Sequence, residues 1–198
     1  MRIFGIDPGS ERTGYGCVET DGRVTRLITC GAITAPTGDP FPDRLARIHR
    51  ELVALLTHCA PDCVAIESLF HAVNVRSALK LGHARGVAML AAVETGCPVV
   101  EYSPAEVKRA VVGYGRAEKH QVQQMVKLLL GLAAPPAPHD AADALAIAIC
   151  HLHSLPPPAA GLDESPDAVG RSRRSATGAQ AGPAKPRSWR QYRPPANG

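Results

Sequence analysis

The sequence predicts an α/β fold in which helices flank both faces of a five-stranded mixed sheet. Its N-terminal part contains three successive strand-like segments, which is typical of an antiparallel meander. The remainder alternates short apolar strands with amphipathic helices, which is typical of parallel strand pairing. Hydrophobic residues make up 45% of the 198 positions, which is enough for one domain with a sizeable core.

The N-terminal strands come first. Residues 2–8 read as a strand with apolar residues on both faces, and this strand carries the carboxylate of Asp7 near its end. Residues 13–20 and 23–33 follow, and the Asp-Gly pair at 21–22 between them is a hairpin turn signal. These three segments therefore predict an antiparallel meander.

The middle of the chain predicts two helices and two further strands. Leucine and isoleucine recur at helical spacing over residues 42–59, and a Pro-Asp pair ends this helix. A short buried strand at 63–66 leads directly into Glu67. A long helix over 75–95 is followed by the fifth strand at 99–102.

Three helices complete the predicted domain. The first two cover residues 104–112 and 118–131, and a proline-rich linker precedes the third at 140–153. Nearly all positions of this last helix are Ala, Leu or Ile, so it should be buried on all sides. Asp140 and Asp143 are three residues apart and share one face, so a buried helix presents two carboxylates.

Each of these acids has a structural alternative. Asp140 could cap its helix, Asp7 could form an Asx turn, and Glu67 could form a salt bridge. Taken together, acids that end strands at one sheet edge should meet there, and close carboxylates repel unless they share a partner. The simplest partner is Mg²⁺ or Mn²⁺. Two such ions can activate water and stabilise the leaving oxygen of a phosphodiester.

Five motifs then point to a known family. The chain contains, in this order, GIDPG, AIESLF, SALKLGHARG, SPAEVKRAVVGYGRAEKHQVQQMV and DAADALAIAICH. With these motifs it resembles the RuvC-type Holliday junction resolvases, the crossover junction endodeoxyribonucleases of the RNase H-like superfold. The resemblance covers about residues 1–153 and leaves out the C-terminal tail.

The resemblance implies an RNase H-like fold and a metal-dependent nuclease that acts in DNA recombination and repair. It assigns the metal-binding catalytic role to four acids: Asp7, Glu67, Asp140 and Asp143. The cofactor it implies is Mg²⁺, with Mn²⁺ as an alternative and two ions per active site. It also implies a homodimer that nicks opposite strands of four-way junction DNA symmetrically, and a partnership with the RuvA–RuvB branch-migration complex.

Further residues are candidates for contact with DNA. Lys108 and Lys119 match basic positions that hold phosphate in the family, although exposed helical faces also carry lysine. Phe70, three residues after Glu67, could be a core residue, and the resemblance favours a role in stacking on junction bases. His139 could assist as a base or a ligand, or simply flank the last helix.

Three other functions remain open at this point. Actin-like sugar kinases and ATPases also begin with a strand that ends in D-x-G, but they need two such domains, and about 155 folded residues are too few. A second alternative is a junction-binding module without catalysis, which the complete set of acids disfavours. A third is an RNase H-like enzyme that cuts RNA–DNA hybrids.

Charge and composition divide the chain into a body and a tail. Residues 1–155 hold 15 basic and 15 acidic side chains, whereas residues 156–198 hold seven basic and three acidic ones. We therefore expect a nuclease domain at 1–155 and a disordered basic tail rich in Pro, Ala and Arg at 156–198. The tail could contact a polyanion or merely increase solubility.

Cysteine content and hydropathy predict the environment of the protein. The six cysteines, at positions 17, 30, 59, 63, 97 and 150, should be buried thiols rather than zinc ligands or disulfides. No apolar run reaches the roughly 18–20 residues of a membrane span, and no signal peptide is evident. A soluble cytoplasmic protein without a membrane partner is expected.

Overall fold

The computed structural model describes residues 1–68 and 74–155, and its centre is a five-stranded sheet of order β3-β2-β1-β4-β5. The central strand β1 (Arg2–Asp7) pairs with β2 (Arg12–Thr20) in an antiparallel ladder, and β2 pairs in the same way with β3 (Thr25–Thr34). The predicted N-terminal meander is therefore confirmed.

The other half of the sheet is parallel. Strand β4 (Cys63–Glu67) pairs in parallel with β1, and β5 (Val99–Tyr102) pairs in parallel with β4. Because β1 and β4 run in the same direction, their carboxyl ends lie at the same edge of the sheet. That edge therefore receives the last residue of each strand, Asp7 and Glu67.

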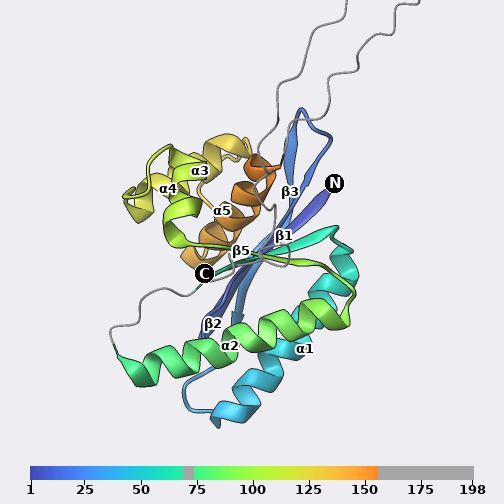
Figure 1. Ribbon diagram of the computed structural model, residues 1–198, viewed down its shortest axis with the longest axis vertical. Helices are drawn as coiled ribbons and strands as arrows, with labels where there is room; N and C mark the ends of the chain where they lie inside the picture. Colours follow the sequence, from blue (N-terminus) through green and yellow to red (C-terminus); the bar gives the residue numbers. More distant parts are fainter. Residues whose placement is uncertain (69–73, 156–198) are drawn as a thin grey trace, which may run out of the picture. The chain divides into compact units, whose positions relative to one another are not determined.

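Helices cover both faces of this sheet (Figure 1). One face carries α1 (Phe41–Cys59) and α2 (Val75–Glu94), which pack against each other. The opposite face carries the three C-terminal helices, α3 (Pro104–Val112), α4 (Lys119–Leu129) and α5 (His139–Ser154). The helix α5 crosses β1 and β2 directly and contacts both α3 and α4.

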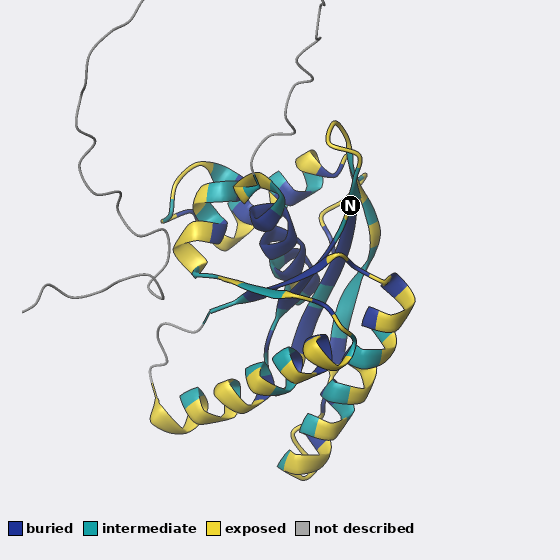
Figure 2. Ribbon diagram, turned by 45° about the vertical axis from the view of Figure 1, so that its right-hand side comes forward, coloured by how far each residue is buried: buried dark blue, intermediate teal, exposed yellow. Residues whose placement is uncertain are grey.

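Strand alternation separates the two hydrophobic cores. In β1, Ile3 packs with the α3–α4–α5 layer, whereas Phe4 and Ile6 pack with the α1–α2 layer. Ten of the eleven positions of α5 from Ala141 to His151, all except Asp143, are buried, and Figure 2 shows most of this helix in dark blue. The layer that contains α1 and α2 has broad exposed faces instead.

The predicted elements agree with the structure to within about two residues at each boundary. The largest differences are in β3, which begins at Thr25 instead of residue 23, and in α4, which ends at Leu129 before Gly131 adopts a φ of 62°. The six cysteines are free thiols, and all are buried except Cys30, which is partly exposed. Within residues 1–68 and 74–155, no helix has both the length and the apolar character of a membrane span.

Candidate active site

Two carboxylates face α5 because of the alternation of side chains along the strands. Residues two apart in a strand point to the same face of a sheet. Asp7 therefore points to the same side as Ile3, and Glu67 to the same side as Ala65, which both pack in the layer of α5. Residues Ile6 and Ile66 are paired in the β1–β4 ladder, so the two acids follow paired positions on neighbouring strands.

Glycines on β1 and β2 allow α5 to lie unusually close to the sheet. A Cβ atom at Gly5 would lie 2.0 Å from the carbonyl oxygen of Ala144, and one at Gly14 would lie 2.1 Å from that of Asp140. At Gly16 a Cβ would lie 2.6 Å from the side chain of Leu145. At Gly5 and Gly14 the contacts are with the backbone of α5, so any side chain there would force the helix to move. These two glycines therefore set how close α5 lies to the sheet.

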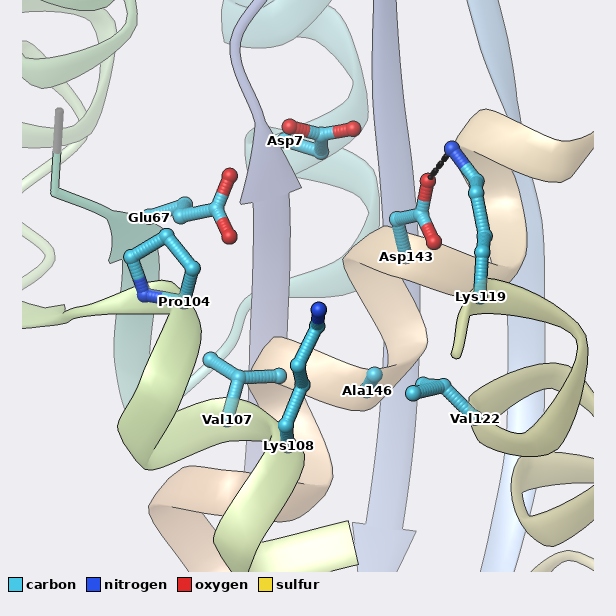
Figure 3. A pocket seen from close by; sticks show the side chains of 9 residues that line it. All are labelled: Asp7, Glu67, Pro104, Val107, Lys108, Lys119, Val122, Asp143 and Ala146. Atoms are coloured by element: carbon cyan, nitrogen blue, oxygen red, sulfur yellow. Dashed lines mark ion pairs between the residues drawn. The ribbon is translucent and has the colours of Figure 1, made fainter. Parts of the chain in front are cut away.

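These elements enclose a pocket of about 270 Å³ at the edge of the sheet. Three carboxylates line it: Asp7 from β1, Glu67 from β4 and Asp143 from α5 (Figure 3). The remaining lining comes from three helices: Pro104, Val107 and Lys108 of α3, Lys119 and Val122 of α4, and Ala146 of α5. Acids from three separate parts of the chain thus share one cavity, as the sequence predicts.

The pocket makes negative charge costly. Burial raises the pKa of Asp7 to about 7, and the neighbouring charges of Glu67, Asp143 and Asp140 add to this effect. Burial also raises the pKa of Glu67, and the charge of Asp143 contributes. Both shifts mean that burial and mutual repulsion disfavour the ionised carboxylates, and a bound cation would offset both effects.

Two lysines supply part of the missing positive charge. The Nζ atom of Lys119, the first residue of α4, lies 2.5 Å from a carboxylate oxygen of Asp143. Burial alone would lower the pKa of Lys119, but the hydrogen bond and charge of Asp143, with Asp7 and Asp140, raise it overall. Lys108 extends from α3 toward the carboxylates, as Figure 3 shows. Both predicted basic residues therefore lie in the pocket.

The fourth predicted acid has different surroundings. Asp140 lies one turn before Asp143 and is not among the lining residues; its carboxylate lies 3.1 Å from Nε of Arg12. It is still near enough to contribute to the raised pKa of Asp7. His139 forms a 2.6 Å hydrogen bond between its Nδ1 and the amide of Gln123, away from the pocket lining. Phe70 lies outside the described residues.

The donor set of the pocket fits a hard divalent cation. Three carboxylates converge on one cavity, and oxygen ligands of this kind are those that Mg²⁺ and Mn²⁺ prefer. Among residues 1–68 and 74–155, no three acidic, His or Cys side chains form a ready-made metal cage. Lys119 pairs with one carboxylate oxygen of Asp143, so a cation bound at that oxygen would compete with Lys119.

Arg12 and the three glycines are the site residues that the sequence did not predict. Gly14 and Gly16 share one face of β2, and Gly16 pairs with Gly5 across the β1–β2 ladder. Glycine at alternate positions of a strand signals close approach of another backbone, so this feature was readable in the sequence. The pairing of Arg12 with Asp140 had no such signal, because it joins residues that are distant in the chain.

The mixed sheet, the helices on its two faces and the acidic pocket at the carboxyl ends of β1 and β4 define the class of RNase H-like nuclease folds. A model of the family "Crossover junction endodeoxyribonuclease RuvC" matches residues 3–151. The chain belongs to this family.

Individual relatives support the same family. The chain is 54% identical over 156 residues to the crossover junction endodeoxyribonuclease RuvC of Chloroflexus aggregans, which covers 79% of this chain and 95% of the relative. It is 57% identical over 155 residues to the protein of the same name from Koribacter versatilis, covering 78% and 93%, respectively.

Solved structures agree with the sequence comparison. Thermus thermophilus RuvC in complex with a Holliday junction substrate matches with a TM-score of 0.74 and 38% identity, over 77% of this chain and 93% of that one. The yeast mitochondrial Holliday junction resolvase Ydc2 matches with a TM-score of 0.54 at 15% identity, over 76% and 78% of the two chains, which shows a shared fold. The predicted RNase H-like fold is therefore confirmed.

Proposed function

We propose that the protein is an endonuclease that resolves four-way (Holliday) DNA junctions by paired symmetric nicks during recombination and repair. The observation that carries this proposal is the pocket in which Asp7, Glu67 and Asp143 converge, in a chain that belongs to the RuvC family. The structure of the Thermus thermophilus relative with a Holliday junction substrate supports a junction as the substrate of this chain.

We assign the catalytic and metal-binding roles to Asp7, Glu67, Asp140 and Asp143. The cofactor is Mg²⁺, with Mn²⁺ as an alternative, and two ions act in each site; such ions supply an activated water and stabilise the leaving oxygen of a phosphodiester. The raised pKa values of Asp7 and Glu67, which come first from burial and then from neighbouring acids, support this assignment, because a bound cation would offset both effects.

The two lysines in the pocket act on the DNA phosphate. Lys119 and Lys108 are the cationic side chains that line the cavity, and phosphate contacts of this kind dominate the affinity of proteins for nucleic acids. In the free protein Lys119 forms an ion pair with Asp143. When the site is loaded, Lys119 is released from this pair and can contact a phosphate oxygen. We retain His139 as an auxiliary residue and Phe70 as a base-stacking residue of the junction interface.

A homodimer matches the symmetry of the substrate, because a protein with two-fold symmetry can place one active site at each of the two symmetry-related strands of a junction. The exposed faces of α2 and α1 provide a suitable surface. Leu79 and Leu90 of α2 are 60% and 51% exposed, and they line adjoining apolar grooves with Leu45 of α1. Exposed apolar patches of this kind mark sites of protein association, and we place the dimer contact here.

The remaining assignments concern the whole chain. We propose a nuclease domain at residues 1–155 and a basic tail at 156–198, and we propose that the protein works with the RuvA–RuvB branch-migration complex. Because the proposed substrate is chromosomal DNA in a bacterial type of repair system, we place the protein in the cytoplasm.

A comparison of substrates tests this function. The full chain is incubated with a four-way junction, a plain duplex of the same sequence and an RNA–DNA hybrid, each with Mg²⁺ or Mn²⁺. The proposal predicts paired nicks at opposite junction strands and little cleavage of the duplex or the hybrid. Preferential cleavage of the hybrid would contradict the assigned substrate, and full activity of Asp7→Asn would contradict the assigned site.

A further inference from the structure

The turn that follows Asp7 has unusually little support from the sheet. Pairing of β1 with β4 ends at Ile6, and pairing of β1 with β2 ends at Asp7 itself. The next residue is Pro8, which has no N–H group to donate. Asp7 also lies in a pocket with two further carboxylates, Glu67 and Asp143, and like charges push one another apart. Something other than the ladder must therefore fix this turn.

Two buried polar side chains contact the turn from different elements. Thr13 of β2 is 0% exposed, and its hydroxyl donates to the carbonyl oxygen of Gly9 at 2.8 Å while it accepts from the N–H of Gly9 at 3.4 Å. Arg44 of α1 is 4% exposed and donates from Nη2 to the carbonyl oxygen of Ser10. In the described part of the chain only one other polar or charged residue, His151, is buried.

Arg44 is costly to bury in these surroundings. No carboxylate of the described residues forms an ion pair with it, and its Nε has no hydrogen-bond partner among them. Its guanidinium lies over the ring of Phe41 at 5.7 Å from the centroid. A buried guanidinium without a paired carboxylate disfavours folding. An aliphatic side chain would fill the same space without that cost, but it could make neither the contact with the Phe41 ring nor the hydrogen bond to Ser10; the second of these reaches the turn after β1.

We propose that Thr13 and Arg44 are positioning residues, which fix the Gly9–Ser10 turn from two sides and thereby hold the Asp7 carboxylate at the metal-binding pocket. This inference rests on the proposed function, in which Asp7 binds the metal. Groups that orient the ligands of a metal in this way change metal affinity or activity by about 10- to 100-fold when they are removed. Contact with DNA is not part of their role.

The test compares Thr13→Val, which removes the hydroxyl at nearly constant volume, with Thr13→Ser, which keeps it. Arg44→Lys is the second variant, because it keeps the charge but loses the guanidinium fork. Thr95→Val is the matched control: the Thr95 hydroxyl donates to the carbonyl oxygens of Ala91 and Ala92 at the end of α2, so its loss removes a comparable hydrogen bond away from the turn.

Two quantities are measured on the full-length variants: the rise in melting temperature of the free protein on titration with Mn²⁺, and the Mn²⁺ concentration that gives half-maximal junction cleavage. Junction affinity in EDTA serves as a third measurement. Thr13→Val and Arg44→Lys should require about tenfold more Mn²⁺ in both titrations, with junction affinity within twofold of the parent. Thr13→Ser should restore the parental requirement, and Thr95→Val should retain it.

An unchanged Mn²⁺ requirement in either folded variant, or equal effects of Thr13→Val and Thr95→Val, would overturn the positioning role. Asp7→Asn separates this inference from the proposed function. If Asp7→Asn abolishes cleavage while Thr13→Val behaves as the parent, only the positioning role is wrong. If Asp7→Asn cleaves normally, the proposed site itself is wrong.

Discussion

Asp7→Asn should stabilise the metal-free protein, although it removes a residue that the proposed reaction needs. The pKa of Asp7 rises from 3.8 to about 7 in the folded protein, first because the group is buried and then because Glu67 and Asp143 repel its charge. The folded protein therefore keeps a proton that the unfolded chain gives up. The stability of the protein is highest below pH 4 with respect to this group, and it falls as the pH rises to about 7.

The size of this effect follows from the shift itself. One pKa unit corresponds to about 1.36 kcal/mol, so a shift of about three units costs up to about 4 kcal/mol above pH 7. At pH 5 the cost is about 1.6 kcal/mol by the same relation. Asparagine carries no charge, so Asp7→Asn should exceed the parent in unfolding free energy at pH 8, and the difference should shrink by about 2–3 kcal/mol at pH 5.

Urea denaturation followed by far-ultraviolet circular dichroism, at pH 5 and pH 8 in EDTA and at one fixed protein concentration, measures this difference. Asp39→Asn is the control, because Asp39 is a surface residue whose only ion pair within residues 1–68 and 74–155 is a 3.9 Å contact with Arg47. Its substitution should change the unfolding free energy by less than about 0.5 kcal/mol at either pH. A variant Asp7→Asn that is less stable than the parent at pH 8, or whose difference does not depend on pH, would refute the electrostatic reasoning.

Three further substitutions test other parts of the structure. Gly14→Ala places a Cβ 2.1 Å from the carbonyl oxygen of Asp140, so it should lower the unfolding free energy by about 1–3 kcal/mol and reduce junction cleavage. Gly38→Ala, where a Cβ meets nothing within 4 Å, should do neither, and normal cleavage by a folded Gly14→Ala protein would contradict the close approach of α5. Lys119→Met should lower the cleavage rate by about 10²-fold, because it removes the cation beside Asp143. Lys127→Met, in the last turn of the same helix, is the control, and equal cleavage rates for the two variants would exclude a special role for Lys119. Leu90→Glu should convert the proposed homodimer to a monomer in light scattering, while Leu128→Glu, at a 68% exposed position of α4, should leave it intact. A dimer that persists in Leu90→Glu would contradict the proposed contact surface.

Much of the fold was predictable because local patterns and tertiary structure agree. Apolar strands bounded by turn signals, and helices with apolar residues at helical spacing, define all ten elements, and the position of an acid at the end of β1 and of β4 follows from the same patterns. Parallel pairing of these two strands then brings Asp7 and Glu67 to one edge. In such cases the sequence determines the site almost directly.

The parts that escaped prediction depend on distances between remote segments. Asp140 and Asp143 share a helix face, yet one pairs with Arg12 of β2 and the other with Lys119 of α4. The contact of Arg44 with the carbonyl oxygen of Ser10 joins α1 to the turn after β1. Neither partnership has a local pattern, since each depends on how the helices pack on the sheet.

The most direct test of the account is the position of bound Mn²⁺. Anomalous diffraction from crystals of the full-length protein soaked in Mn²⁺ at pH 8 locates the ions without reference to activity. The account predicts an ion in the pocket in contact with Asp7 and with Glu67 or Asp143, and a Lys119 that has left its ion pair. The account would be contradicted if Mn²⁺ bound only elsewhere and Lys119 kept its ion pair with Asp143, in crystals of a protein that cleaves junctions in solution.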